Sequence, residues 1–149
     1  MKRTAAIAFT IAFAITACGS SDAMVAPLGR SGGSRLVVDK SQFGTMLFNA
    51  RRQAIYVFSA DARGKSNCYG ECARLWPPVY TTGKPRAGSG VKASLLGTTR
   101  RKGGRLQVTY AGRPLYYYLH EGPGQVLCHN VDLNGGIWKV LAPSGRPRR

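Results

Sequence analysis

The sequence contains two related halves, because a set of residues recurs about 60 positions further along the chain. The recurring positions are Tyr56 and Tyr116, Phe58 and Tyr118, Asp61 and Glu121, Cys68 and Cys128, and Trp76 and Trp138. A cysteine and a tryptophan that return at matching offsets indicate an internal duplication. Two copies are too few for an open solenoid, so we expect the halves to pack face to face and to bury each other's apolar surface.

Short apolar runs with β-forming residues fill both halves, and Gly, Pro, Asn or Arg clusters separate them. The 19 Gly and 8 Pro among 149 residues also argue against a helical bundle. We therefore predict an all-β domain over residues 35–143, in which two tandem β repeats form a small sandwich or barrel-like unit. The repeats span about 36–82 and 95–143, a helical turn is expected only near 70–75, and 144–149 form a basic tail. Strands are expected at 36–38, 45–48, 55–58, 106–110, 115–119 and 137–141.

The N-terminus has the pattern of an export signal. Positive residues precede an apolar stretch at 5–16, and small residues follow directly before Cys18. This pattern resembles the bacterial lipobox, which predicts a signal peptide at 1–17, an acylated Cys18 and a flexible tether over 18–34. The alternatives are an ordinary signal that is cut elsewhere and a short signal anchor. The resemblance implies a membrane-anchored envelope protein, on the periplasmic face or outer membrane of a two-membrane cell or on the surface of a one-membrane cell.

The motifs of the body resemble one known family. The run Tyr56-Val57-Phe58-Ser59-Ala60-Asp61 is similar to the Tyr-x-(Phe/Trp/Tyr)-x-x-Asp signature of a bacterial secreted-repeat lipoprotein family. The segments 64–73, 76–78, 112–118 and 136–138 are similar to that family too, so the likeness covers about 36–143. It implies a tandem-repeat lipoprotein of uncharacterised function and supplies no catalytic residues.

Three positions depart from the family pattern. Glu121 replaces the second Asp, and we expect its longer side chain to change the local hydrogen bond. Arg52 stands where the second half has Gly112, and a positive φ there costs Arg about 1 kcal/mol. Cys128 adds a third cysteine to the body.

The repeated aromatic and acidic residues allow two interpretations. Tyr56 and Phe58 share one face of a strand, and Asp61 can fix the turn that follows. In the first interpretation Tyr56, Phe58, Asp61, Tyr116, Tyr118 and Glu121 are a fold signature of core aromatics and turn-capping acids. In the second they line a ligand cleft with carboxylates at its rim.

The cysteines of the body also allow more than one arrangement. Cys68 and Cys72 are close enough in sequence for a disulfide in an oxidising compartment, although either could instead bridge to Cys128. As an alternative, Cys68, Cys72, Cys128 and His129 could supply three sulfurs and an imidazole to copper or zinc. That arrangement would make the protein a periplasmic copper-binding or thiol-redox protein.

The charge is strongly positive, with 22 Lys+Arg against 6 Asp+Glu. Loss of residues 1–17 removes Lys2 and Arg3 and leaves +14, mostly at turns and the tail. Such a field attracts anionic lipid head groups or envelope polymers, whereas the sequence carries no motif for specific nucleic-acid binding. It also carries no nucleophile elbow and no paired-carboxylate pattern. We therefore predict a non-catalytic binding or structural module of the cell envelope, without an obligatory cofactor.

Overall fold

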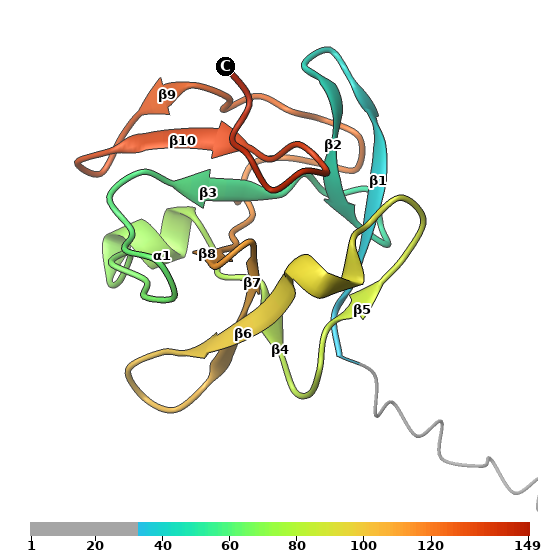
Figure 1. Cartoon of the computed structure of the whole chain (residues 1–149). Coiled ribbons are helices and arrows are strands. Elements are labelled where there is room, and N and C mark those ends of the chain that lie inside the picture. The colour runs from blue at the N-terminus through green and yellow to red at the C-terminus, as the bar shows by residue number, and fades with distance from the viewer. Residues whose placement is uncertain (1–32) are drawn as a thin grey trace, which may run out of the picture.

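The computed structural model describes residues 33–149 (Figure 1). The predicted signal peptide, the acylated Cys18 and nearly all of the predicted tether therefore lie outside the described residues. The elements in chain order are β1 (Arg35–Ser41), β2 (Gly44–Asn49), β3 (Tyr56–Phe58), α1 (Glu71–Leu75), β4 (Tyr80–Thr81), β5 (Arg86–Ala87), η1 (Ala93–Leu95), β6 (Leu96–Arg100), β7 (Leu106–Tyr110), β8 (Arg113–Pro114), β9 (Val131–Asp132) and β10 (Ile137–Val140). Among these residues, no helix is long and apolar enough to cross a membrane.

The strands form three small sheets with the orders β2-β1-β5, β3-β10-β9 and β4-β7-β6, and β8 also pairs with β7. The all-β prediction with two repeats is confirmed, as are the helical turn near 70–75 and the strands predicted at 36–38, 45–48, 106–110 and, except for Leu141, 137–141. The strands of residues 33–149 do not close into a barrel, so the barrel-like alternative is wrong. With only three or four strands, each sheet is too narrow to curl around and meet its own edge.

Each half completes its sheet with a segment from the other half. Tyr56–Phe58 of the first half pairs with Trp138–Val140 of the second. In the reciprocal arrangement, Tyr116 bridges to Pro78 and the N–H of Tyr117 donates to the Pro77 carbonyl at 2.9 Å. At the centre, Tyr56 and Tyr116 exchange backbone hydrogen bonds of 2.9 and 3.0 Å. The two repeats are therefore interlocked.

This interlocking explains the strand prediction that failed. Residues 115–119 do not form one regular strand, because their backbone groups bond in turn to Val108, Tyr56, Pro77 and Leu75. A segment that changes partner at successive residues cannot form a continuous ladder. Strand β6 was missed because its sequence, Leu-Gly-Thr-Thr-Arg, has too few apolar residues to stand out.

The end of the chain is part of the fold. The Arg148 N–H donates to the Val140 carbonyl at 2.9 Å, and Leu141 bridges to Pro147. The guanidinium of Arg148 also donates to the Thr45 carbonyl. The predicted basic tail thus turns back along β10, and its Arg148 is held against β2.

Candidate functional site

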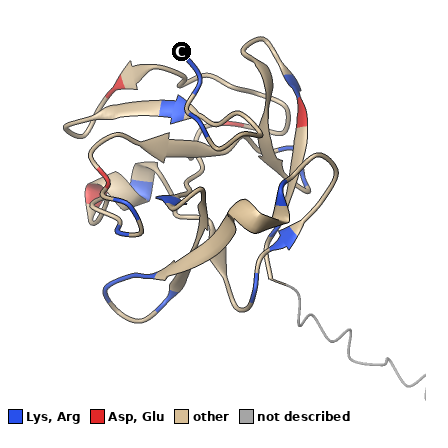
Figure 2. Ribbon diagram, viewed as in Figure 1, with Lys and Arg blue, Asp and Glu red and all other residues tan. Residues whose placement is uncertain are grey.

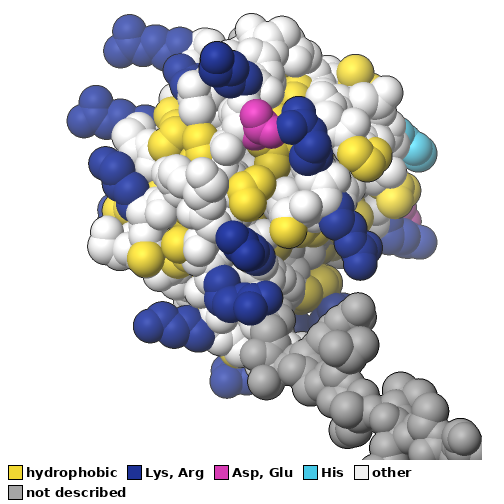
Figure 3. Space-filling view, turned by 90° about the vertical axis from the view of Figure 1, so that its right-hand side faces the viewer, with side chains coloured by type: hydrophobic (Ala, Val, Ile, Leu, Met, Phe, Trp, Pro, Cys, Tyr) yellow, Lys and Arg dark blue, Asp and Glu magenta, His cyan; other side chains and the backbone are white. Residues whose placement is uncertain are grey.

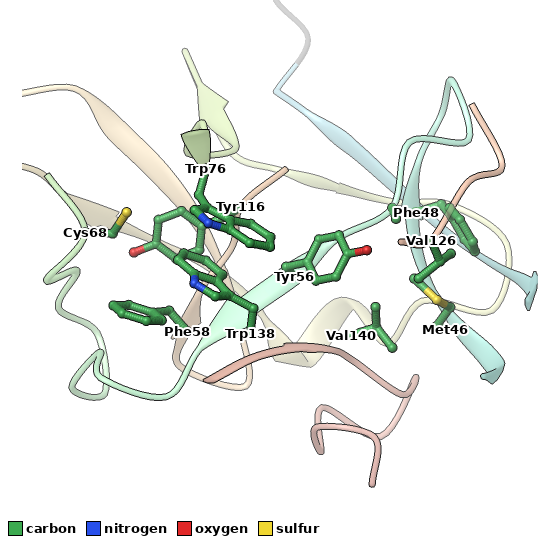
Figure 4. Close-up of a cluster of buried hydrophobic side chains, with 11 residues drawn as sticks. Met46, Phe48, Tyr56, Phe58, Cys68, Trp76, Tyr116, Val126, Trp138 and Val140 are labelled. Carbon is green, nitrogen blue, oxygen red and sulfur yellow. The ribbon is translucent and has the colours of Figure 1, made fainter. Parts of the chain in front are cut away.

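The centre of the molecule is a column of stacked aromatic rings (Figure 4). Trp76 and Trp138 stack with ring centroids 3.8 Å apart and planes 2° apart. Phe58 stacks on the outer face of Trp138 at 4.3 Å, and Tyr118 lies against Trp76 at 4.8 Å. Each tryptophan thus contacts an aromatic residue of the opposite half. Of the residues that the sequence suggested for a ligand cleft, Tyr56, Phe58, Tyr116 and Glu121 are buried in or beside the column, and Asp61 and Tyr118 are half-buried. The burial of these four residues supports the fold-signature interpretation.

Two Tyr–acid pairs link the halves beside this column. Tyr56 donates its hydroxyl hydrogen to Glu121 Oε1 at 2.5 Å, and Tyr116 donates to Asp61 Oδ2 at 2.7 Å. Each tyrosine therefore binds the acid of the other repeat. The acids also accept main-chain N–H groups six residues further along the chain, from Leu127 to Glu121 and from Asn67 to Asp61.

The two pairs differ in how the carboxylate oxygens are used. Asp61 accepts the tyrosine on Oδ2 and the backbone N–H on Oδ1. Glu121 accepts both on Oε1, and its Oε2 is buried without a hydrogen-bond partner among the described residues. The longer side chain thus reaches both donors but leaves one oxygen unpaired.

Burial sets the protonation of these groups. Desolvation raises the pKa of Glu121, and its hydrogen bonds with Tyr56 and Leu127 lower it by less. Desolvation likewise raises the pKa of Asp61 against the lowering effect of Asn67, Tyr116 and Arg101. Burial and the neighbouring acid also raise the pKa of both tyrosines, so they stay protonated as donors.

One functional residue escaped the sequence analysis. Arg101 is buried with 5% exposure, whereas its neighbours Arg100 and Lys102 are exposed. Its guanidinium donates to Ser66 Oγ, Gln107 Oε1 and the Cys68 carbonyl at 2.6, 2.8 and 2.5 Å. Because Ser66 also contacts the Tyr116 hydroxyl at 2.7 Å, Arg101 ties the β6–β7 turn to one Tyr–acid pair.

The cysteines form a bridge and a free thiol. Cys68 and Cys72 are joined by a disulfide with a Cα–Cα distance of 5.3 Å, and Cys128 is free. The disulfide prediction is confirmed. Burial, assisted by the Glu121 charge, raises the pKa of the Cys128 thiol, which disfavours the reactive thiolate.

The four residues suggested for copper or zinc do not form a ligand set. The His129 ring packs against Phe43 at a tilt of 54° with the ring centroids 4.4 Å apart, and its Nδ1 accepts the Val140 N–H at 3.3 Å. Within residues 33–149, no three His, Cys, Asp or Glu side chains lie close enough together to hold a metal ion. The disulfide has moreover taken two of the proposed sulfurs.

The turn at Arg52 has the backbone conformation that the sequence alignment suggested. Arg52 has φ of 62°, and the matching Gly112 has φ of 76°. A left-handed conformation is unfavourable for Arg, and the side chain here forms an ion pair with Asp39. A surface ion pair of this kind contributes at most about 1 kcal/mol, so it only partly offsets the strain.

The exposed surface with the clearest chemistry is the turn between β6 and β7. Two grooves flank it, one of about 310 Å³ with Lys65, Tyr69, Arg100 and Lys102, and one of about 530 Å³ with Ser34, Tyr80, Arg100 and Arg105. The cations of this turn are held in place by neutral groups. Arg105 lies 3.4 Å from the Tyr80 ring, Lys102 lies 5.2 Å from the Tyr69 ring, and Arg100 donates to the Gly104 carbonyl. We call residues 100–105 the basic turn.

The fold and its centre define an all-β module of two interlocked repeats. A family model described as a secreted repeat of unknown function matches residues 37–80 and 97–142. The chain therefore belongs to this secreted-repeat family, Lipoprotein_15, and an exported protein is consistent with that membership. Comparisons with the curated proteins and with the solved structures gave no significant match.

Proposed function

We propose that the chain is a lipid-anchored protein of the cell envelope that acts as a non-catalytic binding module. The observation that carries this proposal is the internal use of the signature residues. Two hydrogen bonds beside the aromatic column join the repeats: Tyr56 of the first repeat bonds to Glu121 of the second, and Tyr116 of the second bonds to Asp61 of the first. Groups that hold the two repeats together in this way are not arranged to meet a substrate. The exposed surface then offers mainly positive charge, and its partners are anionic envelope polymers or lipid head groups.

The anchor is supported by the small residues before Cys18 and by membership in a secreted family. Several acyl chains on one cysteine would hold the protein at a membrane stably, because each buried CH₂ contributes about 0.8 kcal/mol. A tether of the length of 18–34 would keep the domain close to that surface.

Metabolic labelling with an alkyne fatty acid in a bacterial host tests the anchor. We expect label on the wild-type chain and on Cys128→Ser, and loss of label and of membrane association in Cys18→Ser. The Cys128→Ser control excludes acylation of the free thiol. Label that persists in Cys18→Ser, or a soluble unlabelled wild-type protein, would contradict the proposal.

A further inference from the structure

The start of the described chain lies inside a group of cations. Ser34 lines the same groove as Arg100 and Arg105. Its hydroxyl donates to the Tyr80 carbonyl at 2.6 Å, and its N–H donates to Thr81 Oγ1 at 3.1 Å, so this end of the chain is fixed to β4. Next to it, Arg35 and Arg86 face each other across the β1–β5 pairing. Gly33 packs against the backbone of Lys84.

These cations lie at one end of the domain and are exposed. The set is Arg35, Lys84, Arg86, Arg100, Lys102 and Arg105, which we call the basic end. In Figure 2 the ribbon around the β6–β7 turn, the β4–β5 connection and the start of β1 carries blue segments and no red ones. The space-filling view in Figure 3 shows cationic side chains close to the start of the described chain.

Carboxylates do not neutralise the basic end. The ion pairs among residues 33–149 are Arg52–Asp39 and Arg74–Glu71, and neither includes a cation of the set. The residues that line the two grooves of the basic turn include no acid. Cations that are held by neutral groups and lack a carboxylate partner are free to bind an external anion.

We propose that the basic end is a docking surface for the anionic phospholipid head groups of the membrane to which the tether leads. This inference rests on the proposed anchor for its orientation: a chain held at Cys18 leaves the domain from the middle of this cation group. The membrane surface is thereby the anion source closest to the basic end. The acyl chains would already hold the protein at the membrane, and the basic patch would add a second contact with the same surface. The patch would hold the domain in one orientation.

Vesicle binding by the unacylated chain tests the inference without relying on the anchor. The protein is the chain from residue 18 with Cys18→Ser, and the vesicles contain phosphatidylcholine with or without roughly one third phosphatidylglycerol. We expect binding only to the anionic vesicles, with an affinity that falls as salt rises from roughly 0.05 to 0.5 M. A failure here leaves the fatty-acid labelling result untouched, and a failure of labelling leaves this assay untouched.

Two variants of equal charge separate a docking surface from the general positive field. The test variant changes Arg100, Lys102 and Arg105 to Gln, and the control changes Lys40, Lys139 and Arg149 to Gln. Lys40 lies five residues along β1 from Arg35, about 17 Å away. At about 1 kcal/mol for each cation near an anionic surface, the test variant should bind on the order of 100-fold more weakly. The control should change affinity less than about fivefold.

Three results would overturn the inference. One is an equal loss in both variants, because the field would then act without a defined face. Another is equal binding to neutral vesicles. The third is binding of soluble polyphosphate that depends on the basic turn while anionic vesicles are not bound, which would assign the surface to a polymer instead. Thermal unfolding of both variants tests whether the substitutions leave the fold intact, which matters most for the half-buried Lys139.

Discussion

Removing one tyrosine hydroxyl, Tyr56→Phe, tests whether the Tyr–acid pairs hold the repeats together. The substitution keeps the ring in its contact with Trp76. It removes the donor to Glu121 and also the acceptor of a longer, 3.3 Å hydrogen bond from the Cys128 N–H. A hydrogen bond to a charged group contributes about 1.5–3 kcal/mol, so we expect a loss of that size in the free energy of unfolding. For a domain of this length, at roughly 4 °C per kcal/mol, the melting temperature should fall by about 6–12 °C.

Tyr117→Phe is the matched control. Its hydroxyl accepts a neutral hydrogen bond from Asn49 at 3.3 Å and contacts no acid. We expect a loss of only about 0.5–1 kcal/mol from this variant. Both variants lose one hydroxyl from a largely covered tyrosine. The difference between them reports the contact with the buried carboxylate together with the longer bond from Cys128.

The pH dependence of the free energy of unfolding tests the Tyr56–Glu121 contact more specifically than the stability loss at a single pH. Burial raises the pKa of Glu121 in the folded protein, so the native state binds its proton more tightly than the unfolded chain does. The contribution of this group to stability is therefore fully present below the unfolded pKa and is lost as pH rises through the folded pKa. Without the Tyr56 hydroxyl the folded pKa rises further, and the loss caused by Tyr56→Phe should be larger at about pH 7 than at about pH 4.

Denaturant unfolding at both pH values, with the wild type and both variants, measures this effect. The loss for Tyr117→Phe should be the same at the two pH values. If Tyr56→Phe costs no more than Tyr117→Phe, or costs the same at both pH values, the hydroxyl does not stabilise a buried carboxylate. The interlocked centre would then depend on ring packing alone.

Four further outcomes follow from the same contacts. Glu121→Gln should flatten the pH dependence of stability between about pH 4 and pH 7, as measured by denaturant unfolding, whereas the exposed Glu71→Gln should leave it unchanged. Arg101→Lys should lower the free energy of unfolding by about 2–4 kcal/mol, because an ammonium cannot reproduce the three planar hydrogen bonds. The segment 36–82 expressed alone should give the circular dichroism spectrum of an unfolded chain, because its β3 lacks β10; a cooperative melting transition would disprove the interlocking. In the reduced protein, Cys128→Ser should leave the Cu(I) affinity unchanged in a competition titration. A loss of Cu(I) affinity of more than about tenfold would support the four-ligand copper hypothesis instead.

The sequence was sufficient for the features that repeat. The duplicated aromatic and acidic positions predicted two related β halves, and the alignment of Arg52 with Gly112 pointed to a positive φ that the structure contains. The spacing of Cys68 and Cys72 favoured their disulfide. These features depend on local backbone geometry or on similarity between the two halves, and both can be read along one chain.

The features that depend on contacts between the halves could not be predicted in the same way. Nothing in the spacing distinguishes Tyr56 bound to Asp61 of its own repeat from Tyr56 bound to Glu121, which is 65 residues away. Arg101 stands between two exposed cations and has no sequence mark of its own, although it is the one that the fold buries. Its burial depends on where Ser66 and Cys68 come to lie, which is fixed only when the repeats have exchanged segments.

This exchange also determines where the proposed membrane-facing surface lies. The closing segment of the first half continues into β4, which pairs with β7 of the second half at Tyr80 and Gln107. That pairing brings the basic turn beside β4, and the Ser34 bonds to the same strand bring the start of the chain to the same place. The contacts that interlock the repeats thus also place the chain entry and the unpaired cations at one end.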